Sequence, residues 1–199
     1  MSRRIDYYFT PISPWVFLGS ERFHAIAAKA GADIAYRPVN FGTIFPASGG
    51  LPLAKRAPQR QAYRLVELRR WADHLGIPLN PTPTTFPQPD ELAALTLIAA
   101  DEAGADMKTL STALGRAVWV EDRDISDRET LCEIVEKCGA DPALVERAGG
   151  GGDIRAHRDA YTQQALEAGV FGAPSYVVDG EIFWGQDRLD FLERALAGK

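Results

Sequence analysis

The sequence has few of the residues that build disulfide frameworks or metal centres. Its 199 residues include two cysteines, Cys132 and Cys138, and three histidines that are scattered along the chain. The cysteines form neither a C-x-x-C motif nor a zinc-binding spacing with those histidines. We therefore expect unpaired thiols in a reducing compartment and no metal site.

Long apolar runs and clusters of basic charge are also missing. No stretch approaches the ~18 uninterrupted apolar residues of a membrane span, and the first residues lack the apolar segment of a secretory signal. The 27 Asp and Glu outnumber the 22 Lys and Arg, which gives a formal net charge of −5 without any basic stripe. We therefore expect a cytoplasmic protein that binds neither membranes nor nucleic acid.

The chain does contain enough apolar material for a folded core. Hydrophobic residues make up 46% of the sequence, which separates it from disordered compositions. A length of 199 residues suits one domain, or one domain with a sizeable insertion.

The first forty residues predict a β-α-β unit. Residues 5–9 (IDYYF) are typical of a short buried strand, residues 14–30 carry apolar side chains at helical spacing, and residues 32–39 fit a second strand. Such a connection is right-handed and joins parallel strands. Ser13 and Pro14 stand where a helix takes its N-cap and its first residue. On these residues alone, a plain capped helix and a functional motif are both open.

The middle of the chain predicts a long loop followed by helices. Residues 40–53 are rich in Gly and Pro and show no periodicity, and a loop of this length suggests a functional role. Ser126 and Glu129 form a capping box, while the glycines at 149–152 predict a turn rather than a phosphate-binding loop. The predicted helices cover residues 55–75, 91–103, 107–120, 126–137, a short stretch from 142, and 154–168.

The C-terminal segment predicts a β-hairpin and a final helix. Residues 175–178 and 181–184 read as short strands, and Asp179-Gly180 between them is a strong two-residue hairpin signal. Residues 187–197 carry leucines on one helical face. The order along the chain is therefore β-α-β, then helices, then β-β-α.

This order, with a proline just before the third strand, resembles a thioredoxin fold of the DsbA type. The resemblance implies an α/β fold with a discontinuous thioredoxin-like domain, residues 1–45 and 170–199, and an inserted all-helical domain, residues 46–169. DsbA-type oxidoreductases carry C-P-x-C where this chain has Ser13-Pro14-Trp15-Val16. Thiol–disulfide exchange through this motif is excluded because both sulfurs are missing.

A serine in place of the first cysteine resembles two other groups, the kappa-class glutathione transferases and the 2-hydroxychromene-2-carboxylate isomerases. Their pattern has an S-P-aromatic helix opening, a G-x-P before the third strand and an F/W-G-x-D-R turn before the last helix. A segment at residues 119–125 (WVEDRDI) also resembles the family, less specifically. The three matches are Ser13-Pro14-Trp15, Gly172-Ala173-Pro174 and Trp184-Gly185-Gln186-Asp187-Arg188.

The resemblance implies glutathione as the cofactor and Ser13 as the catalytic residue. A hydrogen bond from the Ser13 hydroxyl and the positive end of its helix would both favour the thiolate form of the cofactor. The implied cofactor-binding residues are, in chain order, Ser13, Ala173, Pro174, Trp184, Gly185, Gln186 and Asp187.

The other implied roles each have a simpler alternative. The backbone of Ala173, next to a cis Pro174, would pair with the cysteinyl part of glutathione, but Pro174 could equally be a plain turn proline. The turn amides at 185–187 would receive the γ-glutamyl carboxylate. Asp187 would meet the ammonium of that group, or could merely cap the last helix.

Two departures from the family pattern concern the substrate side. Val16 stands where members often carry a small polar residue, and Gly50 stands where many carry an asparagine. Asn40 or Lys55 could replace that amide, although we expect Lys55 to be exposed. Which residue substitutes for the missing asparagine stays open.

The function implied first is a glutathione-dependent isomerase of a conjugated aromatic acid, acting by reversible thiolate addition. Phe41, Phe45 and Trp119 are candidate walls for that substrate, with ordinary core positions as the alternative for each. A kappa-like glutathione transferase or peroxidase is the second hypothesis, and a non-catalytic thioredoxin-like binding module is the third. The resemblance also implies a homodimer.

Overall fold

The computed structural model describes residues 3–198, and within them four strands form one mixed sheet in the order β2-β1-β3-β4. The parallel pair β1–β2 and the antiparallel hairpin β3–β4 agree with the predicted β-α-β and β-β-α units. Strand β3 joins the two units because it pairs antiparallel with β1. The strands are β1 (Arg4–Phe9), β2 (Asp33–Pro38), β3 (Ser175–Val178) and β4 (Glu181–Trp184).

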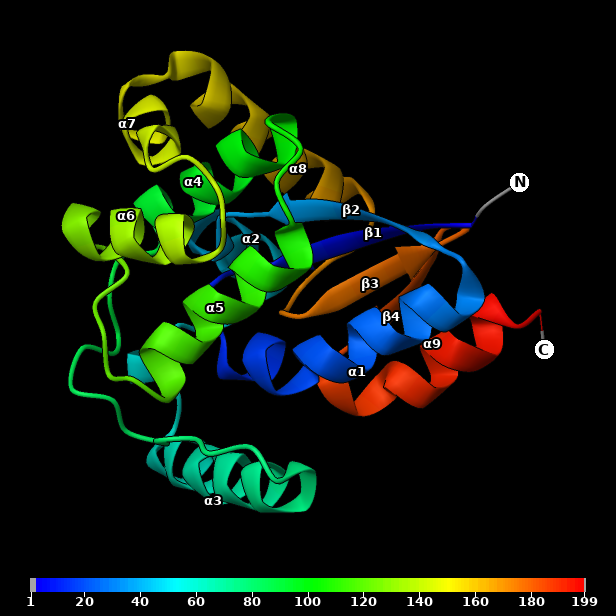
Figure 1. Ribbon diagram of the computed structural model, residues 1–199. Coiled ribbons are helices and arrows are strands. Elements are labelled where there is room, and N and C mark those ends of the chain that lie inside the picture. The colour runs from blue at the N-terminus through cyan, green and yellow to red at the C-terminus, as the bar shows by residue number, and fades with distance from the viewer. Residues whose placement is uncertain (1–2, 199) are drawn as a thin grey trace.

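Helices cover the sheet and gather at one of its ends (Figure 1). Helices α1 and α9 lie side by side along the sheet, whereas α4 to α7 form a separate layer beyond it and α3 lies below α1 in that view. Two short 3₁₀ turns, η1 (Leu53–Lys55) and η2 (Gln186–Arg188), precede α3 and α9. The helices are α1 (Pro14–Ala30), α2 (Phe41–Ser48), α3 (Pro58–Leu75), α4 (Glu91–Glu102), α5 (Met107–Trp119), α6 (Arg128–Lys137), α7 (Ala143–Gly150), α8 (Gly152–Glu167) and α9 (Leu189–Leu196).

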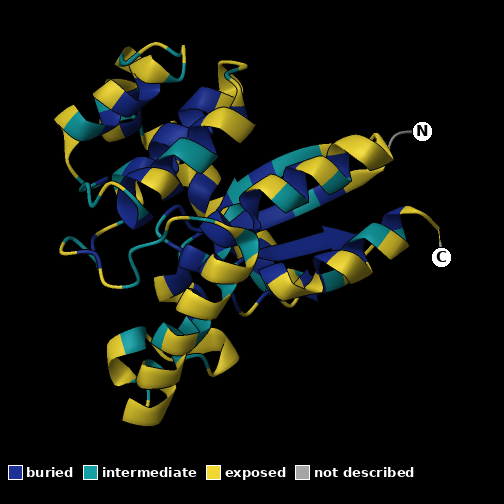
Figure 2. Cartoon of the chain, turned by 60° about the horizontal axis from the view of Figure 1, so that its bottom comes forward, coloured by how far each residue is buried: buried dark blue, intermediate teal, exposed yellow. Residues whose placement is uncertain are grey.

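The centre of the sheet is aromatic. Tyr7 stacks on Phe9 and on Tyr176, with ring centroids 4.5 and 5.3 Å apart, and Phe23 of α1 packs against Tyr7 at 4.6 Å. Side chains alternate across a strand, so Tyr8 points to the other face and joins a second cluster under α2 and α8. Figure 2 shows the sheet buried between helices whose outer faces are exposed.

Two local predictions for the helical region were wrong, and a third was right only in part. The predicted loop at 40–53 contains α2. Its N-cap is Asn40, whose Oδ1 accepts a hydrogen bond from Gly42 N at 2.9 Å. Helix α6 is capped by Asp127, which accepts from Thr130 N at 2.8 Å, and Ser126 instead donates to Asp124. The predicted turn at 149–152 is a break at one residue, because α7 ends at Gly150 and α8 begins at Gly152.

The division into two domains stays a prediction, and its boundary between residues 45 and 46 falls inside α2. Within residues 3–198, no helix combines the length and the apolar character that crossing a membrane requires.

The β3–β4 hairpin has the turn that the sequence predicted. Asp179 and Gly180 occupy its two central positions with φ of 52° and 84°, and Val178 pairs with Glu181 across the turn. Positive φ at both central residues defines a type I′ turn, whose twist matches that of the flanking strands. The hairpin sets the position of Trp184 and of the turn that follows it.

Replacing Gly180 by alanine should therefore destabilise the protein. The site has open space for a methyl group, so the cost comes from the left-handed backbone, roughly 1–2 kcal/mol. The control is Gly150→Ala, where the added methyl group also meets open space and φ is not positive. Urea unfolding should show a lower free energy of unfolding for Gly180→Ala only, and equal values for the two variants would contradict this account.

Candidate active site

Three sequence motifs meet at one end of the sheet. Tyr8 pairs with Ser175 across β1 and β3, and Ser175 pairs with Trp184 across β3 and β4. The segment after β1, the segment before β3 and the segment after β4 therefore leave the sheet at the same end. These segments carry Ser13, Pro174 and the turn at 185–187, as the resemblance implied.

Ser13 forms the N-cap of α1, with Pro14 as its first residue. The Oγ atom of Ser13 accepts a hydrogen bond from Val16 N at 3.3 Å, and only 8% of the residue is exposed. Within residues 3–198 the hydroxyl proton has no acceptor, so it is available to a ligand. The side chain thus offers a hydrogen-bond donor at the positive end of a seventeen-residue helix.

The proline loop and the following turn are tied together. The Ala173–Pro174 peptide bond is cis, and the Pro174 carbonyl accepts a hydrogen bond from Gly185 N at 2.8 Å. Trp184 is 50% exposed, and its indole lies directly on Gly172, where an added Cβ would overlap the Nε1 atom. The glycine of the G-x-P motif therefore makes room for the tryptophan of the second motif.

The turn at 185–187 is held against α1. Gly185 has φ 97° and ψ 148°, a conformation that essentially only glycine adopts. Gln186 is 2% exposed, and Arg22 of α1 donates to its backbone oxygen at 3.1 Å and to its side-chain Oε1. A Cβ on Gly19 would lie 2.8 Å from that of Gln186, which shows how closely the turn approaches the helix.

Asp187 does not cap the last helix. Neither η2 nor α9 has a side-chain cap, and Asp187 Oδ2 accepts instead from Arg188 at 2.7 Å on the protein surface. Gln186 and Asp187 begin the helical segment, so their backbone N–H groups have no partner within it. Among residues 3–198, neither of these two donors has an acceptor.

The residues that the sequence suggested for the substrate side have different positions in the structure. Phe41 and Trp119 are buried core residues, Asn40 caps α2, and Lys55 is exposed as expected. At Gly50, an added Cβ would approach Phe45 to 2.7 Å. The ring of Phe45 therefore fills the space beside Gly50.

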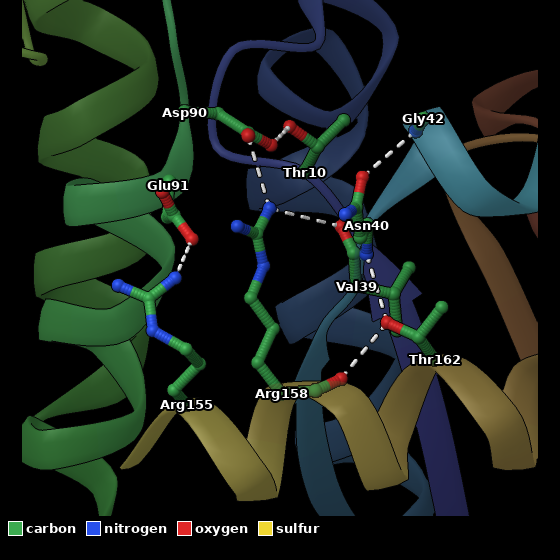
Figure 3. Close-up of polar contacts among 9 residues, drawn as sticks. All are labelled: Thr10, Val39, Asn40, Gly42, Asp90, Glu91, Arg155, Arg158 and Thr162. Atoms are coloured by element: carbon green, nitrogen blue, oxygen red, sulfur yellow. Dashed lines mark hydrogen bonds and ion pairs between the residues drawn. The ribbon is translucent and has the colours of Figure 1, made fainter. Parts of the chain in front are cut away.

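A buried ion pair links the loop that carries Ser13 to the helices (Figure 3). Asp90, at the start of α4, accepts from Arg158 of α8 at 2.9 Å through Oδ1 and from the Thr10 hydroxyl at 2.6 Å through Oδ2. The Thr10 carbonyl in turn accepts from Ser13 N at 3.1 Å. Sequence reasoning missed this network because Asp90 lies 68 and 80 residues from its partners.

Comparison with known proteins gives consistent results. The family model of the DSBA-like thioredoxin domain matches residues 4–197. A 2-hydroxychromene-2-carboxylate isomerase of Sphingobium xenophagum is 34% identical over 202 residues, covering 98% of this chain and 99% of its own length. A glutathione S-transferase kappa 1 of Caenorhabditis elegans is 36% identical over 81 residues, covering 40% of this chain and 35% of its own length. A solved structure of 2-hydroxychromene-2-carboxylate isomerase superposes with a TM-score of 0.77 at 26% identity, covering 98% of this chain and 95% of that chain.

The Asp90–Arg158 ion pair leads to a prediction about stability, and the Glu91–Arg155 pair beside it provides the control (Figure 3). Arg158→Met leaves the half-buried Asp90 carboxylate without its cation and should lower the free energy of unfolding by about 2–4 kcal/mol. Arg155 lies one turn earlier on α8 and pairs with exposed Glu91, so Arg155→Met should cost less than ~1 kcal/mol. Chemical denaturation measures both, and equal losses would show that the Asp90 pair has no special role.

Proposed function

The chain belongs to the DSBA-like thioredoxin domain family, as its motifs predicted, and we propose that it is a glutathione-dependent isomerase of a conjugated aromatic acid. Relatives named 2-hydroxychromene-2-carboxylate isomerase match along almost the whole chain, which supports an isomerase role. The observation that carries the proposal is the Ser13 hydroxyl. It sits at a helix N-terminus, in place of a redox cysteine, with no acceptor among residues 3–198.

The described residues fit glutathione. Ser13 and Gly19 are six residues apart along α1, which is about 9 Å at ~1.5 Å per residue. An extended tripeptide spans about 10 Å, enough to reach from Ser13 to the turn that packs on Gly19. Ser13, the Ala173 backbone and the N–H groups of Gln186 and Asp187 would hold it, with Trp184, Pro174 and Gly185 shaping the site.

Bound glutathione would supply a thiolate that adds reversibly to a conjugated carbon of the substrate and so allows rotation about a former double bond. The chain's own part is to keep that sulfur ionised. A free thiol of this kind has a pKa of about 8.5, so most of it is protonated at neutral pH. The Ser13 hydroxyl donates a hydrogen bond to the anionic form, and the end of α1 adds a favourable potential.

A kappa-like glutathione transferase or peroxidase is the second candidate. It is supported by the Caenorhabditis elegans relative, whose similarity covers 40% of this chain. The same residues would activate the same thiolate in either reaction. A kappa transferase of Rattus norvegicus also matches 99% of the chain, at 22% identity. The isomerase is favoured because its named relatives are 30–34% identical over 96–98% of the chain.

The two candidates predict different fates for glutathione. With 2-hydroxychromene-2-carboxylate and substoichiometric glutathione, the isomerase should bring the whole substrate pool to equilibrium while total thiol stays constant. A stable conjugate, with conversion ending when the thiol is used up, identifies a transferase. Equilibration at the same rate without glutathione, or none at all, would overturn the proposal. Chromatography of substrate and product with a parallel thiol assay distinguishes these results.

Ser13→Ala tests the proposed activation directly. The variant loses one charge-assisted hydrogen bond, worth roughly 1.5–3 kcal/mol, so the pKa of the bound thiol should rise by about 1–2 units. The thiol is active when deprotonated, so a raised pKa reduces the rate at neutral pH. Activity should fall there by about ten- to a hundredfold and recover partly at alkaline pH, where the thiolate forms unaided.

The matched control is Asp127→Ala, which removes the N-cap of α6 away from the site. Losing a cap costs about 1 kcal/mol of stability in either variant. Only Ser13→Ala should shift the pH–rate profile, whereas both should lower the melting temperature. If both variants kept the wild-type profile, Ser13 would be a helix cap and nothing more.

A further inference from the structure

Arg64 of α3 is a cation without a counter-charge. Its guanidinium lies over two aromatic rings, 5.3 Å from the Phe86 centroid and 5.6 Å from the Trp119 centroid. It is partly buried, and it forms no ion pair or hydrogen bond within residues 3–198. Burial and, to a smaller extent, the charge of Arg56 lower the pKa of this guanidinium to about 10. Arg64 therefore remains charged at neutral pH in partly desolvated surroundings.

Arg56 adds a second positive charge, near enough to lower the pKa of Arg64. Its Nε atom donates to the Leu51 carbonyl at 2.8 Å, and its guanidinium lies 5.9 Å from the centroid of Phe45. No carboxylate within residues 3–198 forms an ion pair with it either. Two neighbouring like charges repel each other, and partial burial strengthens that repulsion. An anion between or beside them would remove this cost.

The packing of α5 on α1 places Trp119 beside the first turn of α1. The helices run in opposite directions, because the Ser20 hydroxyl meets that of Thr112 at 2.7 Å and Phe17 packs on Gly115. Trp119 follows Gly115 by four residues, one helical turn. It therefore lies one turn beyond Phe17, at the end of α1 that Ser13 caps.

The packing of α3 on α1 places Arg64 at that same end. These helices run in the same direction (Figure 1), since Arg22 lies over the ring of Trp71 and Leu18 clusters with Leu68. Arg64 precedes Leu68 by one turn on the same face of α3. Two independent helix pairings thus bring Arg64 and its aromatic platform next to the start of α1.

We propose that Arg64, assisted by Arg56, binds the carboxylate of the substrate beside the Ser13 end of α1. The assignment rests on the proposed function, because it names a substrate-binding residue of that site. A guanidinium binds a carboxylate through two parallel hydrogen bonds. Contact with the rings of Phe86 and Trp119 restrains the guanidinium before the ligand arrives, which reduces the entropy lost on binding.

This arrangement also accounts for the departure at Gly50. A glycine provides no side-chain amide for a substrate, and Phe45 occupies the space beside it. The Arg56 guanidinium lies against that same Phe45 ring. In this chain, polar recognition of the substrate moves from the missing amide to the two arginines.

The test is a binding measurement that needs no catalysis. The probes are 2-naphthoate and its neutral analogue 2-naphthamide, titrated calorimetrically into the glutathione-bound protein. Wild type should bind the acid at least about tenfold more tightly than the amide, as expected for a charged hydrogen-bonded pair. Arg64→Gln should remove that preference, and Arg64→Lys should keep part of it. Arg69→Gln, an exposed arginine of the same helix, should match wild type.

The possible results test the carboxylate assignment separately from the proposed function. Equal affinity of wild type for acid and amide overturns the assignment without any variant, and so does an Arg64→Gln protein that keeps the preference. In the isomerase assay, Arg64→Gln should raise KM for 2-hydroxychromene-2-carboxylate by about tenfold or more, with a smaller change in kcat. A wild-type protein that prefers naphthoate yet does not isomerise the chromene acid would refute the proposed function and leave the carboxylate site standing.

Discussion

The carboxylate of Asp90 is the contact on which the geometry of the site depends. It accepts hydrogen bonds both from Arg158, which is 4% exposed, and from the Thr10 hydroxyl. The Thr10 carbonyl in turn accepts a hydrogen bond from Ser13 N. A partly buried carboxylate without a cation would be costly, so Arg158 keeps Asp90 in place and Asp90 keeps the loop in place. Arg158 and Asp90 together hold the loop that presents Ser13 against α4 and α8.

DsbA-type proteins use this fold for disulfide chemistry, with a cysteine at the start of the first helix. This chain has the hydroxyl of Ser13 at that position. A serine cannot exchange disulfides, but it can donate a hydrogen bond to a sulfur supplied by a bound thiol, and the end of α1 favours negative charge at that point. In the proposed function the reactive sulfur thus belongs to glutathione and not to the chain. The two arginines beside the same helix end would then orient an anionic substrate toward it.

Features set by neighbouring residues could be predicted from the sequence. The type I′ turn at Asp179-Gly180 and the cap at Ser13 depend on a few consecutive residues, and both strands of the hairpin have the predicted bounds. Helix α2 was missed because eight residues with an internal proline show no clear period. The cap of α6 was misassigned because Ser126 and Asp127 both suit that role, and Ser126 instead bonds to Asp124.

Features set by residues far apart in the chain could not be predicted. The Asp90 network joins Thr10, Asp90 and Arg158, and no local pattern relates their positions. The unpaired state of Arg64 is a property of the folded chain as well, since only the structure shows that no carboxylate approaches it. The resemblance located Ser13, Pro174 and the turn at 185–187, while the contacts that position them came from the structure.

The central claim is that the Ser13 end of α1 stabilises a glutathione thiolate. Titrating the glutathione-saturated wild-type protein with base, while following the ultraviolet absorbance of the thiolate, measures the pKa of the bound sulfur. The account predicts a pKa clearly below the ~8.5 of the free thiol. A bound thiol that titrates at the free value would contradict it, even if the protein proved to bind glutathione tightly.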